Sequence, residues 1–383
     1  MPVEGWRRPA WAEVDLDALA HNTSLLRRLV APAALCAVVK ADGYGHGARM
    51  VARTLLRAGA SSLGVALVDE GIELRDDGID AAILLLAEAS ATSLRDAIDA
   101  GLTLTVGSLR GAHELVVAAD HRAVPPVHVK VDTGMHRQGV ATGELGAVLE
   151  VLRAGGVAVG GVWTHFPVAD GADAATAAFT RGQLDTFQRA VADVADAIPS
   201  DAVMHAANTA GAVSLPAARL DLVRVGLGVY GYLPHPSMQS ILDDAGAGAL
   251  RPVMSLKARV AAVRDLPAGA RPSYGRRRAL ERASRVATVP VGYADGYPRA
   301  MLDGGAEVLV RGRRRPLAGV VTMDQLLVDC GEDVDVDVGD EVVLLGAQGD
   351  ERITADEWAA VLGTISWEVL CGIKQRVPKL VVS

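Results

Sequence analysis

A lysine at the end of an apolar run is the first residue of this sequence whose type and setting suggest chemistry. Lys40 follows the run 35–39 and precedes a turn, 41–47, that reads Ala-Asp-Gly-Tyr-Gly-His-Gly. Apolar walls lower the pKa of a lysine, and its neutral amine can then attack a carbonyl carbon. Glycines let backbone approach a ligand closely, and a following helix start favours an anion. Taken alone, the motif describes equally well a lysine that merely reaches from a strand end to water.

Polar side chains end several other apolar runs and give Lys40 a context. His128, Lys130 and Asp132 alternate with valines, and burying three such groups on one strand face would be costly without partners. We therefore expect them to face a site, and His165 at the end of another run supports this. A lone histidine is otherwise often a core residue, and glycines after a strand can mark a plain turn. Further clusters contain His205, Asn208 and Thr209, and Arg224, Gly226 and Leu227.

Eight apolar runs alternate with helical stretches over the first part of the chain. Such strands are typical of a parallel sheet covered on both faces. Eight units predict an α/β fold with an N-terminal (β/α)8 TIM-type barrel, whose functional rim carries the polar clusters. A doubly wound open sheet is the alternative, and the strand count distinguishes the two. The expected strands are 35–40, 63–66, 83–87, 102–106, 127–132, 157–165, 203–206 and 222–225, and the expected helices include 16–30, 47–57, 70–76 and 176–197.

The composition of the sequence and the pattern of its apolar runs change after residue 234. Residues 237–251 are rich in Asp, Ala and Gly and are interpreted as a linker. Glycine- and proline-broken runs at 256–263, 286–291, 307–310, 326–329 and 341–345 then predict a smaller, mostly β domain. A helix is expected to start at Thr354, with Glu357 completing a capping box. The expected domains are therefore 1–240, the barrel, and 241–383, the C-terminal β domain.

Composition excludes several classes of protein. The formal net charge is −8 and the arginine clusters are short, which argues against nucleic-acid binding. No apolar run approaches the ~20 residues of a membrane span, and the first residues lack the apolar region of a signal peptide. Cys36, Cys330 and Cys371 are widely spaced and fit neither a disulfide framework nor a zinc site. We expect a cytoplasmic protein with no metal site and no membrane or nucleic-acid partner.

A set of segments is spread along the chain: 39–47, 130–135, Arg137, 164–166, 223–226, 273–275, 292–299 and 323–325. In their order and spacing, these segments resemble the alanine racemase family over essentially the whole chain. Single segments are weak signals, but the set together with a β domain is specific, because barrel proteins that merely bind the same cofactor usually lack that domain. The resemblance implies a pyridoxal 5′-phosphate enzyme, an isomerase, that racemises L-alanine and D-alanine and so supplies D-alanine.

The resemblance also implies catalytic roles. Lys40 would carry the cofactor as a Schiff base and act as the base on one face of the substrate, with Tyr274 on the opposite face. Inversion needs both, since a single base would tend to return the proton to the face it left. His165 would neighbour Tyr274 and contact Arg224, which faces the pyridine nitrogen. An arginine cannot give that nitrogen its proton, and we infer that the ring is then a weaker electron sink.

The same resemblance implies binding roles. Arg137 would lie near the cofactor's phenolic oxygen and the substrate carboxylate, and Lys130 beside it is expected to be carbamylated, as it often is in relatives. Tyr293 and Met323 would line the substrate entrance. Because Tyr274 and Met323 reach the other subunit's site in the family, a homodimer with composite active sites is implied. The expected phosphate and cofactor shell is Tyr44, Asn208, Thr209, Gly226, Leu227 and Trp367.

The sequence departs from the family pattern at a few positions. Trp367 stands where a tyrosine is usual, so a hydroxyl is replaced by one N–H donor and added bulk. Residues 276–278 and 320–322 also differ. These changes leave open a racemase for serine or another small amino acid. A non-catalytic cofactor-binding protein is disfavoured by Tyr274 opposite Lys40, and a decarboxylase by Arg224 and the Lys130/Arg137 pair.

Overall fold

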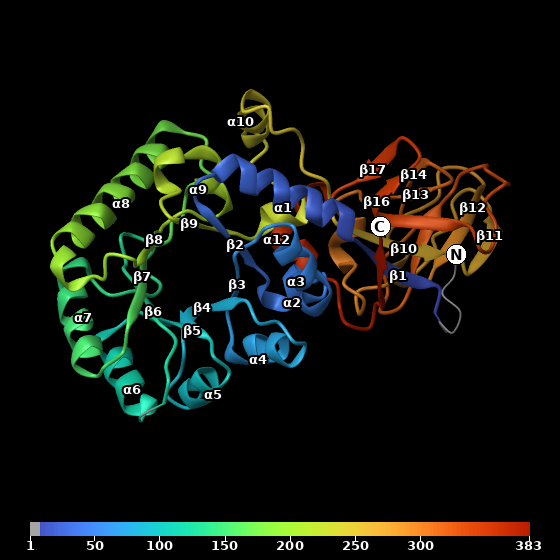
Figure 1. The fold of residues 1–383 in the computed structure, drawn as a ribbon. Helices are drawn as coiled ribbons and strands as arrows, with labels where there is room; N and C mark the ends of the chain where they lie inside the picture. Colours follow the sequence, from blue (N-terminus) through green and yellow to red (C-terminus); the bar gives the residue numbers. More distant parts are fainter. Residues whose placement is uncertain (1–7, 121) are drawn as a thin grey trace. The chain divides into compact units, whose positions relative to one another are not determined.

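The computed structural model describes residues 8–120 and 122–383, which divide into two compact units (Figure 1). The first unit comprises Ala18–Gly43 and Ala48–Arg251, and the second comprises the chain up to Asp17 together with Tyr44–Gly47 and Pro252–Ser383. The observed change of unit comes after Arg251, later in the chain than the expected boundary at residue 240. Two short stretches, at the N-terminus and after Lys40, belong with the C-terminal unit instead, because their partners lie there.

The first unit is built on an eight-stranded sheet in which every neighbouring pair is parallel. The strand order is β8-β7-β6-β5-β4-β3-β2-β9, so the last strand pairs with the first. Each strand is a short apolar run, as expected for strands buried on both faces. The strands are β2 (Ala34–Val38), β3 (Ser62–Val65), β4 (Ala82–Glu88), β5 (Thr103–Val106), β6 (Val127–Lys130), β7 (Val159–Trp163), β8 (Val203–His205) and β9 (Leu222–Val225).

The remaining gap between β8 and β9 is bridged by backbone hydrogen bonds. Asp221 N donates to Met204 O at 3.0 Å, and Arg224 N donates to Ala207 O at 2.9 Å. The sheet therefore closes on itself as a (β/α)8 barrel. The prediction is confirmed, and the open doubly wound alternative is wrong.

Helices cover the outside of this sheet, as Figure 1 shows for α4 to α8. In α1 the apolar positions recur at helical spacing, so that Leu19, Leu25 and Leu26 are all buried. The helix α10 occupies part of the stretch interpreted as a linker, so that interpretation is wrong there. The helices are α1 (Leu16–Val30), α2 (Lys40–Tyr44), α3 (Ala48–Arg57), α4 (Val68–Asp76), α5 (Leu94–Asp99), α6 (Leu109–Ala119), α7 (Leu145–Ala154), α8 (Ala174–Ala192), α9 (Thr209–Ser214) and α10 (Met238–Asp244).

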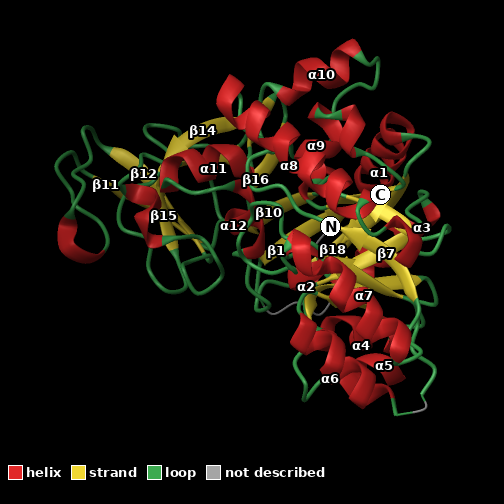
Figure 2. Cartoon of the chain, turned by 90° about the vertical axis from the view of Figure 1, so that its left-hand side faces the viewer, coloured by secondary structure: helices red, strands yellow, loops and turns green. Residues whose placement is uncertain are grey.

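The second unit is mostly β, as predicted, and Figure 2 shows its strands joined by long loops. A seven-stranded sheet has the order β14-β13-β16-β10-β1-β18 with β17 beside β16, and a three-stranded sheet has the order β11-β12-β15. The strands are β1 (Ala10–Asp15), β10 (Met254–Arg259), β11 (Ala262–Leu266), β12 (Ser284–Val289), β13 (Glu307–Val310), β14 (Arg313–Pro316), β15 (Leu326–Asp329), β16 (Glu341–Gln348), β17 (Glu351–Ile353) and β18 (Lys379–Val382).

Two local predictions in this unit have different outcomes. The run 256–263 was expected to be one strand, but it divides between β10 and β11, which belong to different sheets. The helix α11 (Ala355–Leu362) begins after Thr354, whose hydroxyl accepts from Glu357 N at 3.1 Å, so the predicted helix start is confirmed. The second bond of the expected capping box, from Thr354 N to the Glu357 carboxylate, is not found among the described residues. The Glu357 carboxylate accepts hydrogen bonds from Arg314, at 2.6 Å for the shorter.

In the described part of the chain, we find no helix that is both long and apolar enough to span a membrane.

Candidate active site

Lys40 follows β2 at the carboxyl end of the barrel strands and opens an unusual turn. It is half-buried, and the next three residues are all left-handed: Ala41 (φ 53°, ψ 52°), Asp42 (φ 54°, ψ 46°) and Gly43 (φ 63°, ψ 43°). Only Gly43 adopts this region freely, and each of the other two costs roughly 1 kcal/mol. The turn is closed by a hydrogen bond of 2.8 Å from Gly43 N to Val39 O.

Arg224 on β9 is a buried charged group of the same rim with four hydrogen-bond partners. Its side chain is 3 % exposed, and Nη1 lies 2.8 Å from His205 Nδ1. Nη2 donates to Thr164 O at 2.7 Å and to Ala206 O at 2.8 Å, and it lies 3.2 Å from His165 Nδ1. The residues brought together here come from β7, β8 and β9, as the positions of the polar clusters predicted.

The arginine sets the tautomers of the histidines around it. A guanidinium only donates, so the Nδ1 atoms of His165 and His205 must both accept. Each ring therefore carries its proton on Nε2. His205 Nε2 lies 2.8 Å from His128 Nδ1, and this hydrogen bond extends the chain from Arg224 through His205 to His128.

These histidines are held neutral. Burial, reinforced by the positive charge of Arg224, lowers the pKa of His165 and His205 well below 6.5. The same two causes lower the pKa of His128 to about 4. Burial also lowers the pKa of Arg224 to about 9, which leaves the guanidinium charged at neutral pH. One fixed cation with neutral rings around it is thus a permanent feature of the site.

Two cations lie close to the ring of Trp163, at the end of β7. Lys130 Nζ lies 4.7 Å from the indole centroid and Arg224 Cζ lies 4.4 Å from it, both within range of a cation–π interaction. The His205 ring stacks on the same indole at 5.5 Å. Lys130 is 2 % exposed, and burial, followed by the charges of Arg137 and Arg224, lowers its pKa to about 8. The amine is therefore partly neutral near physiological pH.

Asp132 differs from the role expected of it. One of its carboxylate oxygens accepts from the backbone N–H groups of Gly134, Met135 and His136, at 2.9, 3.0 and 3.1 Å. The carboxylate therefore shapes the loop that precedes Arg137, whose side chain is exposed. His128 and Lys130 contact the rim cluster, whereas Asp132 organises the backbone beside it.

A short cradle of donors lies at the start of α9 and after β9. Asn208 caps α9, accepting from Gly211 N at 3.0 Å and donating to Phe166 O at 3.2 Å. The Thr209 hydroxyl accepts from Gly226 N at 3.1 Å, which ties the two loops together. Leu227 begins a 3-10 helix, and the first N–H groups of a helix have no partner within it. Hydroxyl and backbone N–H donors of this kind suit an anion.

Two residues expected near the phosphate lie in the second unit. The segment containing Tyr44 contacts α12 (Ser366–Cys371): a Cβ on Gly45 would lie 2.3 Å from Leu370 O, so only glycine fits there. Trp367 lies on this helix and is half-buried. Burial, with a smaller effect of Cys371, raises the pKa of Tyr44 above its usual value, so its phenol stays protonated.

The expected second base and the entrance residues are exposed in this chain. Tyr274 is 73 % exposed, Met323 is 53 % exposed and Tyr293 is 40 % exposed. Tyr274 stands on a turn in which Ser273, Gly275 and Arg276 have positive φ, and Ser273 Oγ donates to Val320 O at 2.6 Å. The turn thus holds Tyr274 away from the core of its own unit.

A buried carboxylate fixes the loops that carry Tyr293 and Met323. Asp295 is fully buried, accepts from both terminal nitrogens of Arg8 at 2.5 Å and from Gly292 N at 2.8 Å, and pairs with Arg376 at 3.0 Å. Tyr293 N donates to Thr322 O at 3.0 Å and Ala294 N to Met323 O at 3.0 Å, so the two loops are paired directly.

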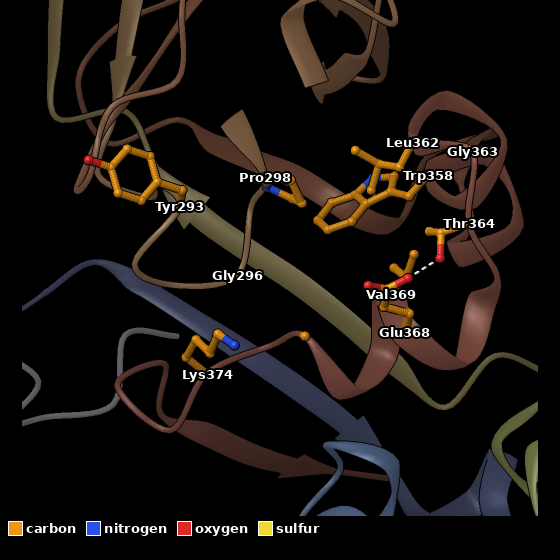
Figure 3. Close-up of a pocket in the computed structure, with 11 residues that line it drawn as sticks. Tyr293, Gly296, Pro298, Trp358, Leu362, Gly363, Thr364, Glu368, Val369 and Lys374 are labelled. Atoms are coloured by element: carbon orange, nitrogen blue, oxygen red, sulfur yellow. Dashed lines mark hydrogen bonds between the residues drawn. The ribbon is translucent and has the colours of Figure 1, made fainter. Parts of the chain in front are cut away.

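A cavity of about 520 Å³ lies beside Tyr293, wholly within the second unit (Figure 3). Its wall includes Trp358 and Val369, and Glu368 accepts a hydrogen bond from Thr364 at its edge. Among the described residues we find no group of three or more His, Cys, Asp or Glu side chains that could hold a metal ion.

The fold and these side chains define a class of protein: a (β/α)8 barrel with a lysine and an arginine on its rim, joined to a β domain. Comparison with known proteins identifies the class more closely. Residues 14–234 match the model of the alanine racemase N-terminal domain, and residues 253–381 match that of the C-terminal domain. The chain belongs to the alanine racemase family.

Individual relatives are similar over their full length. The chain is 44% identical over 383 residues to an alanine racemase of Symbiobacterium thermophilum, covering 99% of this chain and 98% of that one. It is 42% identical over 380 residues to one from Nostoc sp. PCC 7120, covering 97% and 95%. Among solved structures, an alanine racemase from a D-cycloserine-producing Streptomyces lavendulae matches with TM-score 0.90, 37% identity and coverage of 99% and 98%. One from Bacillus anthracis with bound L-Ala-P matches with TM-score 0.90, 33% identity and coverage of 99% and 96%.

Proposed function

We propose that this protein racemises alanine with pyridoxal 5′-phosphate bound covalently to Lys40, and that it does so as a homodimer. The observation that carries the proposal is the hydrogen-bonded Arg224–His165 pair on the rim that also bears Lys40. Membership of a family whose relatives are named alanine racemase supports the reaction and the substrate. We propose a cytoplasmic location and no nucleic-acid or membrane partner.

The residues present fit this cofactor. Lys40 offers an amine for its aldehyde, and the Thr209 hydroxyl and the Leu227 N–H offer donors for its phosphate. Gly226 would lie beside the phosphate and hold Thr209 through its own N–H, with Asn208 ordering their loop. Tyr44 and Trp367 would complete the phosphate shell. When bound, the cofactor delocalises the negative charge that develops at the substrate α-carbon.

Two bases would exchange the α-proton. The Lys40 amine would take or return it on one face, and the phenol oxygen of Tyr274 of the partner subunit on the other. The high exposure of Tyr274 in its own chain suits a residue that reaches a second subunit. Its turn, held by the Ser273–Val320 hydrogen bond, would fix its direction.

His165 and Arg224 would act on these bases and on the cofactor without changing charge. His165 keeps its proton on Nε2, so it would donate to the oxygen of the incoming Tyr274 and stabilise that oxygen when it has lost its proton. Arg224 would donate to the pyridine nitrogen and could not transfer a proton to it. A nitrogen left unprotonated draws less charge, which would limit side reactions of the substrate.

Arg137 would bind the substrate carboxylate, with Lys130 behind it. Two cations at adjoining positions repel, and the charge of Arg137 contributes to the lowered pKa of Lys130. We propose that Lys130 is carbamylated, which would convert a repelling cation into an anion that holds Arg137. Met323 and Tyr293 would line the substrate entrance, and the Asp295 cluster would hold their loops.

Serine or another small amino acid is the second candidate substrate, because Trp367 changes the size of the expected shell. A non-catalytic cofactor-binding protein is the third possibility, and a decarboxylase is the fourth. The Arg224–His165 pair favours racemisation over both, since it would serve a second base opposite Lys40.

A panel of L-amino acids in deuterated water tests the proposal. The purified protein is incubated with each amino acid, and α-proton exchange and chirality are followed together. Inversion of alanine well ahead of serine supports the proposal, and the reverse order favours the second substrate. Exchange without inversion contradicts the two-base arrangement, and absence of exchange with every amino acid removes the catalytic assignment.

A further inference from the structure

Glu70 connects the lysine turn to the neighbouring strand end. It is the third residue of α4, which follows β3, and β3 pairs with β2 in parallel. One carboxylate oxygen accepts from Ala41 N at 2.6 Å. The other accepts from Ala66 N at 2.8 Å and from Leu67 N at 3.1 Å. A single carboxylate therefore holds two rim loops together.

The contacts to Ala66 and Leu67 have an ordinary explanation. A glutamate at the third position of a helix commonly accepts from the residue that caps the helix. The contact to Ala41 has no such explanation, because Ala41 belongs to another loop, 29 residues away, and is bonded to Lys40. Ala41 is also the first of the three left-handed residues of the turn.

The turn needs such a restraint, because Ala41 and Asp42 lie in a region that residues with side chains disfavour. Asp42 holds the far end of the turn by accepting from Ala48 N at 2.9 Å. Glu70 holds the near end, at the peptide that joins Lys40 to Ala41. Hydrogen bonds to a charged acceptor are stronger than neutral ones, which suits a carboxylate at this point.

We infer that Glu70 is a positioning residue for Lys40. Its carboxylate fixes the left-handed turn and so aims the lysine amine into the barrel mouth. The inference rests on the proposed function of Lys40 as the cofactor lysine. Among the described residues, the hydrogen bonds of Glu70 all come from backbone N–H groups, so we assign it no part in the chemistry itself.

Glu70→Gln tests this inference, with Asp69→Asn as the matched control. Both variants remove one carboxylate charge from the first turn of α4, but Asp69 is exposed. The glutamine keeps one oxygen for the cap and presents an N–H₂ group to another N–H, so one of its two sides must lose its bonds. The first readout is amide hydrogen exchange of the segment 39–48 in the cofactor-free protein, beside a melting curve.

The second readout is the rate at which pyridoxal phosphate becomes attached to Lys40, trapped with borohydride and located by peptide mapping. We expect Glu70→Gln to speed exchange in 39–48 and slow attachment, each roughly tenfold, with Asp69→Asn near the parent protein. Equal behaviour of the two variants overturns the inference. If the parent protein attaches no cofactor at Lys40, the proposed function fails, and the exchange result still decides whether Glu70 holds the turn.

Discussion

Nη2 of Arg224 lies 3.2 Å from Nδ1 of His165 and leaves that nitrogen no role except acceptor. The proton of the ring therefore sits on Nε2, the nitrogen opposite the arginine. Because the pKa of His165 is also lowered by burial and by Arg224, this arrangement persists across the physiological pH range. The charged Arg224 thus fixes which nitrogen of the neutral His165 ring can donate a hydrogen bond.

Replacing Arg224 with lysine should show how far the Arg224–His165 pair depends on the planar guanidinium group. A lysine keeps the charge but cannot serve His205, His165 and two carbonyl groups at once. We expect a loss of about 2–4 kcal/mol in the free energy of unfolding and about a hundredfold fall in kcat. Urea unfolding and racemisation assays measure the two effects.

Arg219→Lys is the control for Arg224→Lys. Arg219 also bonds to carbonyl groups of the barrel unit, Ala212 O and Leu29 O, but contacts no histidine of the rim. It should lose some stability and little kcat. An equal fall in kcat for both variants would contradict a specific role for Arg224.

The buried histidines should make stability depend on pH. The pKa of His128 is depressed to about 4 by burial and by Arg224, whereas an unfolded histidine titrates near 6.5. Its contribution is therefore complete above pH 6.5 and is lost as the pH falls toward 4, at no more than about 1.4 kcal/mol per pH unit. His128→Gln should reduce the slope of unfolding free energy against pH by that amount, whereas exposed His113→Gln should not.

Lys130 should carry carbon dioxide. Its buried amine, with a pKa of about 8, is partly neutral near physiological pH and would form an N–C bond to CO2 while releasing one proton to water. With ¹³C-bicarbonate we expect a carbamate signal that grows as the pH rises through 8 and is absent from Lys130→Arg. A native mass equal to that of the unmodified chain, with no such signal, would refute the modification.

Tyr274→Phe should separate cofactor binding from inversion. The variant loses only a hydroxyl on an exposed ring, so we expect the same melting temperature and the same cofactor absorbance. Inversion from at least one enantiomer should fall by at least about a hundredfold, as for loss of a general base. Tyr297→Phe is a fair control, since its buried hydroxyl has no hydrogen-bond partner among the described residues. Full activity of Tyr274→Phe in both directions would remove the second base.

Trp367→Tyr tests the departure at the expected phosphate shell. A tyrosine supplies the hydroxyl that tryptophan lacks, and one added hydrogen bond should tighten cofactor retention by roughly fivefold. Equilibrium dialysis of the cofactor measures this, with Trp367→Phe as the variant that has neither donor. If all three proteins retain the cofactor equally, residue 367 does not bind the phosphate.

Much of the barrel could be predicted because its strands are continuous apolar runs and its rim residues follow them directly. The strand β1 was not predicted, since its pairing partners, β10 and β18, lie more than two hundred residues away along the chain. The helix α10 was missed because the stretch 237–251 that contains it is rich in Asp, Ala and Gly, as a linker would be. Local patterns do not reveal partners that only tertiary folding supplies.

The same distinction applies to the site. Lys40, His165 and Arg224 could be located from their positions at strand ends, and the structure places His165 and Arg224 in contact. Glu70 was missed, although a glutamate three residues into a helix is a recognisable signal, because its bond to Ala41 depends on the β2–β3 pairing. For Asp132, which was grouped with His128 and Lys130 from the alternation of polar residues, the structure shows a local contact that the pattern did not reveal: one carboxylate oxygen accepts from the N–H groups of its own loop.

The hydrogen-bond ladder of the barrel sheet is interrupted between one pair of strands. Between β8 and β9 there is no continuous ladder, and Arg224 crosses this gap twice: its main chain bonds Ala207 O and its side chain bonds Ala206 O. The residue proposed to face the cofactor therefore also holds together the two strands that no continuous ladder joins. We expect local opening of the barrel to begin between β8 and β9. Such opening would therefore disturb the fold and the proposed cofactor contact at the same residue.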